Sequence, residues 1–447
     1  MTYSKIRVMN QINSNMERIK LFESGTDLGI KTIILLVLLY SIVISDTNIK
    51  AQENEDIAVG MSAAFSGPAK ELGLNMRKGV EAYFNTINDE GGINGKKIEL
   101  FSIDDGYEPK YASSNVYNLI NKKGVTSFIG NVGTPTAKAA TPITLENEIL
   151  YFAPFSGSSI LRPYDRKEFL IKTKNSREYQ SNRFIINYRA SYAQETEKII
   201  ENLLHSGINP YEIAIFTQDD SYGFDGYTGA IEALEKRGYL NSKEIPYGTY
   251  QRNSLDIEEG LLEILNSRRE IRAVVIVGSY KPVAKFIKFA SKLIPNAIFI
   301  NVSFVGCLPL AELLDNSSDE VFVTQVVPHF NSNLQIVKDY KEDLNKYFPD
   351  SKPNFVSLEG YISAYLFVEG LKTTNGDYSS EAIIEGIEKI DFQNLNLGFD
   401  LSIDEIDHQI SDNVWLTKIE RDTCKEVSWK EFQNHIEELS VQQTHEE

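Results

Sequence analysis

The sequence predicts an α/β protein made of two doubly wound, parallel-sheet lobes. After residue 56 the chain alternates between short apolar runs and amphipathic segments of helical period, and the alternation restarts near residue 193. Strands joined by helical crossovers form parallel sheets that are covered on both faces, so two such series indicate two lobes. The chain has 447 residues, which is enough for two or three domains. No proline- or serine-rich linker separates the series, so we expect ordered strands to join the lobes.

The first series opens with an apolar run that is typical of a buried strand. The segment after it places Met76, Val80, Tyr83, Phe84 and Ile87 on one face of a helix. The same logic gives the remaining elements. In order, the expected strands are 57–63, 96–105, 125–130 and 149–154, and the expected helices are 74–89, 111–123 and 136–147.

The second series repeats the pattern. Its expected helices are 193–207, 227–238, 257–267 and 282–293, and its expected strands are 212–220, 273–279 and 297–303. Each strand is a run of β-branched and other apolar residues, which is typical of a sheet covered on both faces.

Composition excludes several classes of function. The formal net charge is -18 and no basic cluster interrupts it, so the sequence does not favour a nucleic-acid partner. The five histidines form no HExxH or HxH pair, and we expect neither a metal nor a cofactor. The two cysteines, Cys307 and Cys424, show no CxxC spacing. They can form one disulfide in an exported protein, but the sequence leaves their state open.

The N-terminal segment 1–50 contains the strongest targeting signal. Ile33–Ile44 is apolar apart from Ser41, with Lys31 before it and acidic residues after it. This run is short for a spanning helix and fits the core of a signal peptide that is cut near Ala51. We therefore expect a periplasmic or extracytoplasmic protein. An uncleaved membrane anchor is the alternative.

Polar, glycine-bearing loops follow several of the predicted strands. One such loop lies in Phe128–Ile143, which reads FIGNVGTPTAKAATPI. It places threonine hydroxyls and glycine backbone between a predicted strand and a predicted helix. Ligands of open α/β sheets bind beyond the carboxyl ends of the strands. Helix capping is the simpler interpretation of any single loop, because Gly, Ser, Thr and Asp are common caps. Five such loops together favour a ligand site between the lobes. The other four read FSGPAKELG, APFSGSS, TQDDSYGFDG and VGSYKP.

These motifs resemble the leucine/isoleucine/valine-binding branch of the type I periplasmic binding proteins. SGPAKELGLNMRKGVEAYFNTINDEGGINGKKIELFSIDDGYEP is similar to the family's opening pattern, and IGNVGTPTAKAATPI, QDDSYGFDG and DHQISDNVWL follow in the family's order and spacing. The resemblance covers about residues 56 to 430. It implies a three-strand hinge between lobes that close on a small ligand. The crossings are expected near Tyr188–Ser191, Val326–Pro328 and Asn394–Asp400.

The resemblance also implies which residues bind the ligand. Thr134 falls where the family uses a hydroxyl and adjoining backbone to bind a carboxylate, and Tyr222 and Tyr280 fall where rings of the second lobe cover the ligand. Hydroxyls and free N–H groups at helix N-termini bind an anion without a buried counter-charge. The full set expected to bind the ligand is Thr134, Thr136, Phe155, Ser156, Gly157, Tyr222, Tyr280 and Ser303.

The sequence departs from the family pattern at several positions. Ser303 stands where amino-acid-binding members place a carboxylate for the ligand's ammonium, and serine cannot neutralise a buried cation. Leu72 stands where some members have an aromatic ring, and Gly106 and Gly133 occupy the positions of an early disulfide. We therefore expect a small organic anion or a polar neutral ligand and not a plain zwitterionic amino acid.

The paired carboxylates Asp104–Asp105 and Asp219–Asp220 are compatible with an enzyme, but they also fit loop capping. Asp105 or Asp220 is also able to replace the carboxylate missing at Ser303. No G-x-S-x-G elbow, P-loop or dinucleotide fingerprint accompanies them, so we expect a protein that is not an enzyme.

The leading hypothesis is a monomeric solute-binding protein that delivers its ligand to the membrane subunits of an ABC importer. The alternative is a ligand-sensing module for a membrane signalling partner. We expect no output domain beyond the binding lobes, which favours the first. In both cases only the N-terminal segment touches the membrane. We expect lobe 1 at 51–190 and 327–395 and lobe 2 at 191–326 and 396–447.

Overall fold

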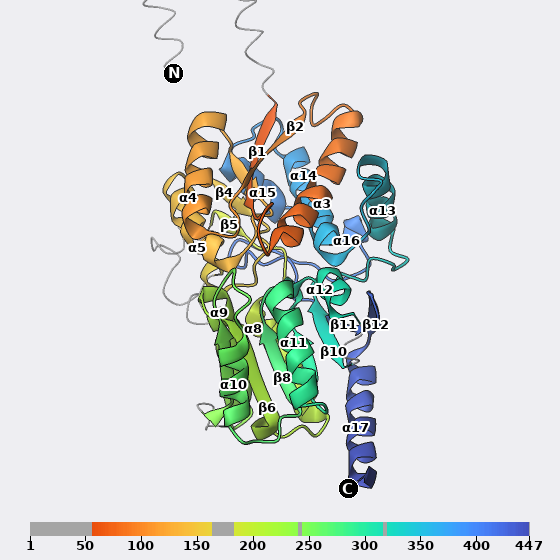
Figure 1. Ribbon diagram of the computed structural model, residues 1–447. Coiled ribbons are helices and arrows are strands. Elements are labelled where there is room, and N and C mark those ends of the chain that lie inside the picture. The colour runs from red at the N-terminus through yellow and green to blue at the C-terminus, as the bar shows by residue number, and fades with distance from the viewer. Residues whose placement is uncertain (1–55, 163–182, 240–243, 316–319, 447) are drawn as a thin grey trace, which may run out of the picture. The chain divides into compact units, whose positions relative to one another are not determined.

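The first sheet occupies the upper half of Figure 1 and contains five strands in the order β2-β1-β3-β4-β5. This computed structural model describes residues 56–162, 183–239, 244–315 and 320–446, so the predicted N-terminal signal lies outside the described residues. All pairings in the sheet are parallel. The strands are β1 Ile57–Ala63, β2 Ile98–Asp104, β3 Ser127–Ile129, β4 Leu150–Phe152 and β5 Ile185–Ile186.

Helices from both ends of the chain accompany this sheet. They are α3 Lys70–Asp89, α4 Pro109–Asn118, α5 Thr134–Glu146, α13 Gln335–Tyr347, α14 Phe355–Thr373, α15 Ser380–Glu388 and α16 Phe392–Leu395. Helix α14 packs against α3 so closely that a Cβ at Gly79 would lie 1.9 Å from the carbonyl oxygen of Ser357. A Cβ at Gly360 would likewise lie 2.4 Å from the carbonyl oxygen of Met76. Glycine at both contacts is therefore a requirement of this helix pair.

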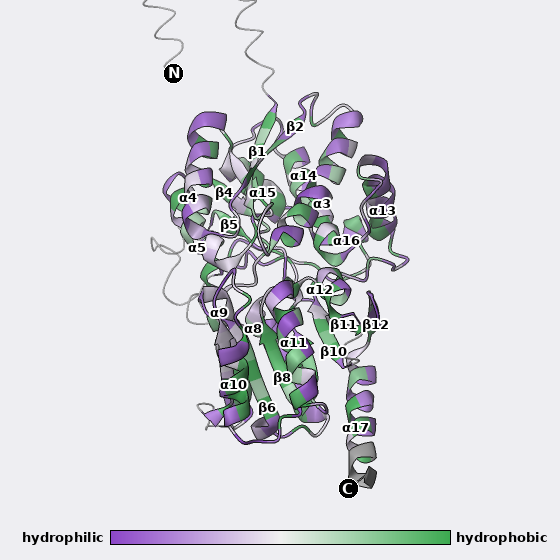
Figure 2. Ribbon diagram, in the orientation of Figure 1, coloured by the Kyte–Doolittle hydropathy of each residue, from purple (hydrophilic) through white to green (hydrophobic). Residues whose placement is uncertain are grey.

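The second sheet contains seven strands in the order β12-β11-β10-β9-β8-β6-β7. The strands are β6 Ile213–Gln218, β7 Tyr247–Tyr250, β8 Ala273–Val277, β9 Ile298–Asn301, β10 Val321–Gln325, β11 Trp415–Glu420 and β12 Thr423–Val427. The pairs from β7 to β10 are parallel, as predicted, but β11 and β12 form an antiparallel hairpin at the edge. The strands β6 and β8 are strongly hydrophobic, while helices such as α11 also carry hydrophilic residues (Figure 2).

The helices of the second sheet are α8 Tyr192–His205, α9 Ser221–Glu235, α10 Glu258–Asn266, α11 Tyr280–Leu293, α12 Cys307–Leu314 and α17 Trp429–Glu446. A disulfide joins Cys307 at the start of α12 to Cys424 in β12 and resolves the question that the sequence left open. It ties the antiparallel hairpin to a helix that follows the parallel strand β9.

Within the described ranges, the chain passes between the two sheets three times, after β5, after β10 and before β11. The first and third passages lie side by side, because the backbone N–H of Asn187 donates to His408 at 2.7 Å and that of Ser411 donates to Tyr188 at 2.9 Å. This pairing falls beyond the predicted third crossing at Asn394–Asp400. The two-sheet α/β class is confirmed, whereas the lobe boundaries themselves stay a prediction.

Candidate functional site

The loops at the carboxyl ends of the strands bring the two sheets into contact. Phe304, which follows β9, has its ring centroid 5.3 Å from Phe155 and 6.1 Å from Tyr107, both of which belong to loops of the first sheet. Gln218 at the end of β6 also donates to the Tyr107 hydroxyl at 3.2 Å. We call this region, where the loops of the two sheets meet, the interlobe site.

Thr134 and Ser156 form the hydroxyl pair of the interlobe site. Their side-chain oxygens lie 2.7 Å apart, and both residues are fully buried. Thr134 begins α5, whose N-cap Gly133 has φ +105° and provides no capping side chain. The ring of Tyr107 occupies the space that a Cβ at Gly133 would need, so a glycine here lets the loop and the ring meet.

The neighbouring predicted residues are engaged with the protein itself. The Thr136 hydroxyl donates to the carbonyls of Val132, at 2.6 Å, and Gly133, at 2.9 Å, which is a local helix-start role. The backbone N–H of Phe155 donates to Asn131 at 2.8 Å. The carbonyl of Gly157 accepts from the N–H of Tyr192 at 2.8 Å. The structure thus brings these residues to one place but occupies several of their polar groups.

Both predicted tyrosines of the second sheet lie at helix N-termini that face the first. Tyr222 is buried at the start of α9, and its ring lies 4.6 Å from Phe304 and 5.0 Å from Tyr192. The hydroxyl of Tyr280, at the start of α11, accepts from the backbone N–H of Glu71 at 3.3 Å. Tyr280 therefore bridges the two sheets directly.

Ser303 leads to a group of charged residues that sequence reasoning missed. Its N–H donates to Oε2 of Glu195 at 2.8 Å, and its hydroxyl donates to Oε1 at 3.0 Å. Arg189 donates from Nη2 to the Ser303 hydroxyl at 2.7 Å and forms an ion pair with Glu359, with Nε 3.1 Å from Oε1. We call Arg189, Glu195 and Glu359 the buried charge triad, since none is more than 2% exposed.

Burial and neighbouring charges shift the pKa values of Glu359 and Arg189. Burial raises the pKa of Glu359 to about 7, although the charge of Arg189 opposes the rise, and the charge of Glu195 adds to it. Burial alone would lower the pKa of Arg189, but the carboxylates of Glu359 and Glu195 outweigh it and hold that pKa above its ordinary value. Arg189 is therefore charged at neutral pH, while Glu359 exchanges a proton near pH 7.

Acidic residues of the two pairs noted in the sequence accept hydrogen bonds from loops and from a helix N-terminus. Asp104 accepts from the backbone N–H groups of Phe65 at 2.7 Å and Gly106 at 2.9 Å. Asp220 caps α9 by accepting from the N–H of Tyr222 at 2.9 Å. Asp105 is buried and accepts from the Ser62 hydroxyl at 2.8 Å and from the backbone N–H of Tyr107. These contacts match the capping interpretation.

Polar contacts at the rim also join the sheets. Glu108 beside the first sheet accepts from Arg252 at 3.0 Å and from Asn253 at 2.7 Å, both of which follow β7. On another side, Asp225 of α9 accepts from the Ser159 hydroxyl at 2.6 Å. The rim contacts and the aromatic rings together hold the loops of the two sheets against one another.

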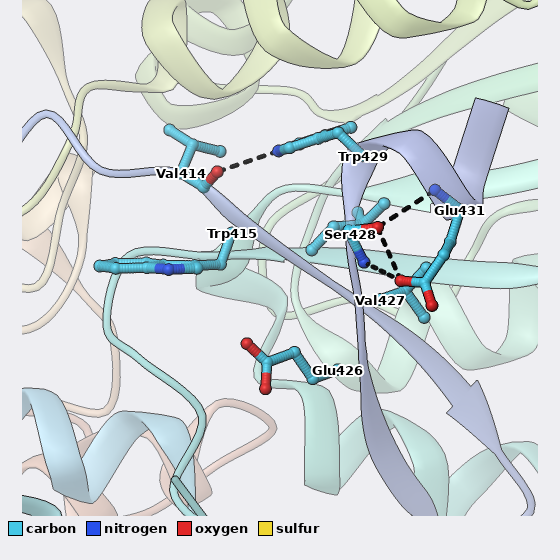
Figure 3. A pocket seen from close by; sticks show the side chains of 8 residues that line it. Val414, Trp415, Glu426, Val427, Ser428, Trp429 and Glu431 are labelled. Atoms are coloured by element: carbon cyan, nitrogen blue, oxygen red, sulfur yellow. Dashed lines mark hydrogen bonds between the residues drawn. The ribbon is translucent and has the colours of Figure 1, made fainter. Parts of the chain in front are cut away.

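A separate hollow of about 470 Å³ lies on the β11–β12 hairpin and the start of α17 (Figure 3). Two indoles border it, and Nε1 of Trp429 donates to the Val414 carbonyl at 3.0 Å. None of the predicted site residues lines it. The lining residues are Val414, Trp415, Leu416, Glu426, Val427, Ser428, Trp429 and Glu431.

Comparison with known families gives one match along most of the chain. The family described as periplasmic binding protein matches residues 56–424. Leu/Ile/Val-binding protein homolog 7 of Brucella abortus is 22% identical over 77% of this chain and 83% of its own length. Shorter matches at 36% identity to Brucella proteins named Leu/Ile/Val-binding protein homolog 1 span only 26% of those proteins. Within the described ranges, no helix has the length and apolar character that a membrane span needs.

Solved structures share the fold. A crystal structure of a possible leucine/isoleucine/valine-binding protein from Rhodopirellula baltica SH 1 superposes with a TM-score of 0.78 at 37% identity, over 85% of this chain and 98% of that one. A branched-chain amino acid ABC transporter protein from Thermus thermophilus, with bound valine, superposes with a TM-score of 0.69 at 16% identity. It covers 84% of this chain and 96% of that one, and it shows similarity of fold alone.

Proposed function

The chain belongs to the periplasmic binding protein family, in its leucine/isoleucine/valine-binding branch, and on this basis we propose that it captures a small organic ligand between its lobes and delivers it to an ABC importer. Proteins of this family bind solutes and are not enzymes, and membership implies an extracytoplasmic location. Delivery to an importer is supported by the family and by the ABC transporter relative of the same fold.

The observation that carries the proposal is the interlobe site itself. Loops from the carboxyl ends of both sheets bury aromatic rings and hydroxyls against one another, while three chain passages join the sheets within the described residues. Such a hinge permits opening, and a ligand that contacts both lobes favours the closed form. We propose that the lobes comprise 51–190 with 327–395 and 191–326 with 396–447, and that the protein acts as a monomer.

We assign ligand contacts to the residues that the sequence predicted. The hydroxyls of Thr134 and Ser156 and the helix N-terminus beside them suit an anionic or carbonyl oxygen. Tyr222 and Tyr280 would cover the ligand from the second lobe. The complete proposed set is Thr134, Thr136, Phe155, Ser156, Gly157, Tyr222, Tyr280 and Ser303.

Small-angle scattering tests the closure. A panel of small carboxylates, amides and amino acids is first screened by thermal shift, because a ligand at about 100 times its Kd adds roughly 2.7 kcal/mol of stability. Each binder is then expected to reduce the radius of gyration of the protein. A radius that stays unchanged at saturation would remove the closing mechanism.

Mass spectrometry of the exported protein distinguishes transport from sensing. A mature chain that starts near residue 51 supports a free binding protein, as the apolar segment Ile33–Ile44 predicts. An intact N-terminus on membrane-bound protein would instead favour a ligand-sensing module for a membrane partner.

A further inference from the structure

We propose that Arg189 is the anchor for a carboxylate group of the ligand, with the Tyr192 hydroxyl beside it. This inference rests on the proposed function and narrows it to a class of ligand, a small carboxylate with an apolar body. It adds two residues that the sequence did not indicate. It also assigns Glu195 and Glu359 as positioning residues that orient Arg189.

Arg189 holds its guanidinium in a fixed orientation, and two of its nitrogens, Nε and Nη1, have no well-aligned hydrogen-bond partner among the described residues. Nε and Nη2 face Glu359, and Nη2 also donates to the Ser303 hydroxyl. The guanidinium carbon lies 4.3 Å from the centre of the Phe155 ring, which supports the planar group from one side. Nη1 is buried and has no hydrogen-bond partner among the described residues. A charged donor that is buried without an acceptor is costly, so an acceptor from the ligand would be strongly favoured.

Tyr192 supplies a second donor at the same place. Its ring packs against Tyr222, with centroids 5.0 Å apart, and its hydroxyl is buried without a well-aligned partner in the described part of the chain. Burial raises the pKa of Tyr192 to about 12, against the pull of Arg189 and of the polar groups of Thr134, Gly157 and Ser156. The hydroxyl is therefore a donor beside the Thr134–Ser156 pair. Arg189 and this group of hydroxyls together present donors at the interlobe site.

The acids of the region are already bound by the protein. Asp105, Glu195 and Glu359 are the buried acids among the described residues. Glu195 accepts from the N–H and hydroxyl of Ser303 and from the Thr324 hydroxyl, and Glu359 accepts from Arg189. Asp105 accepts from Ser62 and from the N–H of Tyr107. An ammonium group would have to displace one of these donors, whereas a carboxylate would complete the unpartnered ones.

A carboxylate bound beside Glu195 and Glu359 needs further stabilisation of its negative charge, and helix N-termini at the site provide it. Helices α5, α8, α9 and α11 all begin at the interlobe site, and their N-termini favour negative charge. The charged or titratable groups that face Glu359 are Arg189 on the first passage, Glu195 on α8 and Tyr188. Because Glu359 exchanges its proton near neutral pH, a second negative charge nearby should raise its pKa and favour its protonated form. Carboxylate binding at pH 7 should therefore take up a fraction of a proton.

Two matched series of probes test the anchor by calorimetry. Each keeps one apolar body and changes the head group: 4-methylpentanoate, 4-methylpentanamide, 3-methylbutylamine and leucine, and then benzoate, benzamide and benzylamine. At least one carboxylate should bind about 30-fold more tightly than its amide and amine partners, which corresponds to a lost charged hydrogen bond. Tighter binding of the amine or of leucine, or no binding by either carboxylate at millimolar concentration, overturns the anchor. A compound that compacts the lobes without this preference would leave the proposed function standing.

Substitution of the arginine gives an independent test. Arg189→Gln should weaken the carboxylate about 30-fold or more and leave the amide nearly unchanged. Arg183→Gln is the matched control, because Arg183 lies on the same segment and pairs with Glu381 and Glu388 away from the site. Equal affinity of the carboxylate for Arg189→Gln and the unmodified protein overturns the proposal.

Proton uptake keeps the proposal testable if Arg189→Gln fails to fold. Calorimetry of carboxylate binding to the unmodified protein in two buffers of different ionisation enthalpy measures the protons exchanged at pH 7. Uptake is expected, and affinity should fall as the pH rises from 6 to 8. Zero exchange or proton release, which a cationic ligand would cause, overturns the proposal.

Discussion

The backbone N–H of Ser303 donates to Oε2 of Glu195 over 2.8 Å. The contact joins the loop after β9 to the first turn of α8, which lie 108 residues apart in sequence. It places a carboxylate next to the position where related amino-acid-binding proteins are expected to carry their own. The oxygens of Glu195 are bound by Ser303 and Thr324, however, so this acid orients the site and is not free for an ammonium group.

Glu108→Ala should shift the protein toward the open form. Glu108 is half-exposed and binds Arg252 and Asn253 across the rim, and such contacts contribute about 0.7 kcal/mol in water. Because these bonds cross between the lobes, the proposed opening would break them, and ligand affinity should fall about threefold. Scattering should show a larger radius for the free variant than for the unmodified protein.

Glu385→Ala is the control for this change. Glu385 of α15 pairs with Lys389, which follows the end of that helix, and makes no contact between the sheets that the described residues show. It should leave both the radius and the affinity unchanged. Identical behaviour of Glu108→Ala and Glu385→Ala would mean that the rim contacts do not bias closure.

The elements with a strong period were predictable from the sequence. The apolar run of β8 and the apolar face of α3 are local patterns that predict a strand and a helix. Ser191 and Gln194 form a capping box at the start of α8, which is also a local signal. The β11–β12 hairpin was missed because its strands contain charged residues such as Lys418 and Glu426 and have no continuous apolar run. β7 was missed because it is a four-residue segment that contains Gly248.

The hydroxyl loops of the site were also predictable, because strand-to-helix loops of a parallel sheet must gather at one edge. The buried charge triad was not. Arg189 and Glu359 are 170 residues apart, and each alone reads as an ordinary charged residue of a helix or loop. Only tertiary packing brings these two residues together and buries them. The sequence around each residue therefore does not indicate the pairing.

Glu359 should make stability depend on pH. Its pKa is about 7 in the folded protein and about 4.5 when exposed, so the folded state binds more protons between these values. The free energy of unfolding should therefore fall as the pH rises from about 4.5 to about 7, by an amount of order 3 kcal/mol. Denaturant unfolding at a series of pH values measures the curve.

Glu359→Gln isolates this contribution. The variant should be less stable above about pH 7, where Arg189 loses its ionic partner, and it should lack the fall between pH 4.5 and 7. Asp105, whose pKa burial raises to about 6, adds a similar slope to both proteins and cancels in the difference. Parallel curves for the two proteins would show that Glu359 does not hold the proton.

Loss of the disulfide should destabilise the second lobe. Cys307 and Cys424 are separated by 117 residues, and a crosslink that closes a loop of this length contributes about 4 kcal/mol by restricting the unfolded chain. Reductant should lower the denaturant midpoint of the unmodified protein to that of the Cys307→Ala/Cys424→Ala variant. Reductant should leave that variant unaffected, and a midpoint that ignores reductant in both proteins would contradict the prediction.

Thr134→Ala should weaken ligand binding. The Thr134 hydroxyl is fully buried, lies 2.7 Å from that of Ser156 and begins a helix without a capping side chain. Removal of one hydrogen bond to the ligand should cost about 1 kcal/mol or more, which is a fivefold or larger loss of affinity for the tightest compound of the panel.

Thr141→Ala separates this effect from a change in stability. Thr141 is a buried threonine of the same helix, and its hydroxyl donates to the Ala137 carbonyl at 3.0 Å, away from the interlobe site. Both variants should lose some thermal stability, because each deletes a buried hydroxyl, but only Thr134→Ala should raise the Kd measured by calorimetry. If the two variants bind the compound equally well, the hydroxyl between β3 and α5 serves the fold and not the ligand, and recognition must rest on Arg189 and the tyrosines.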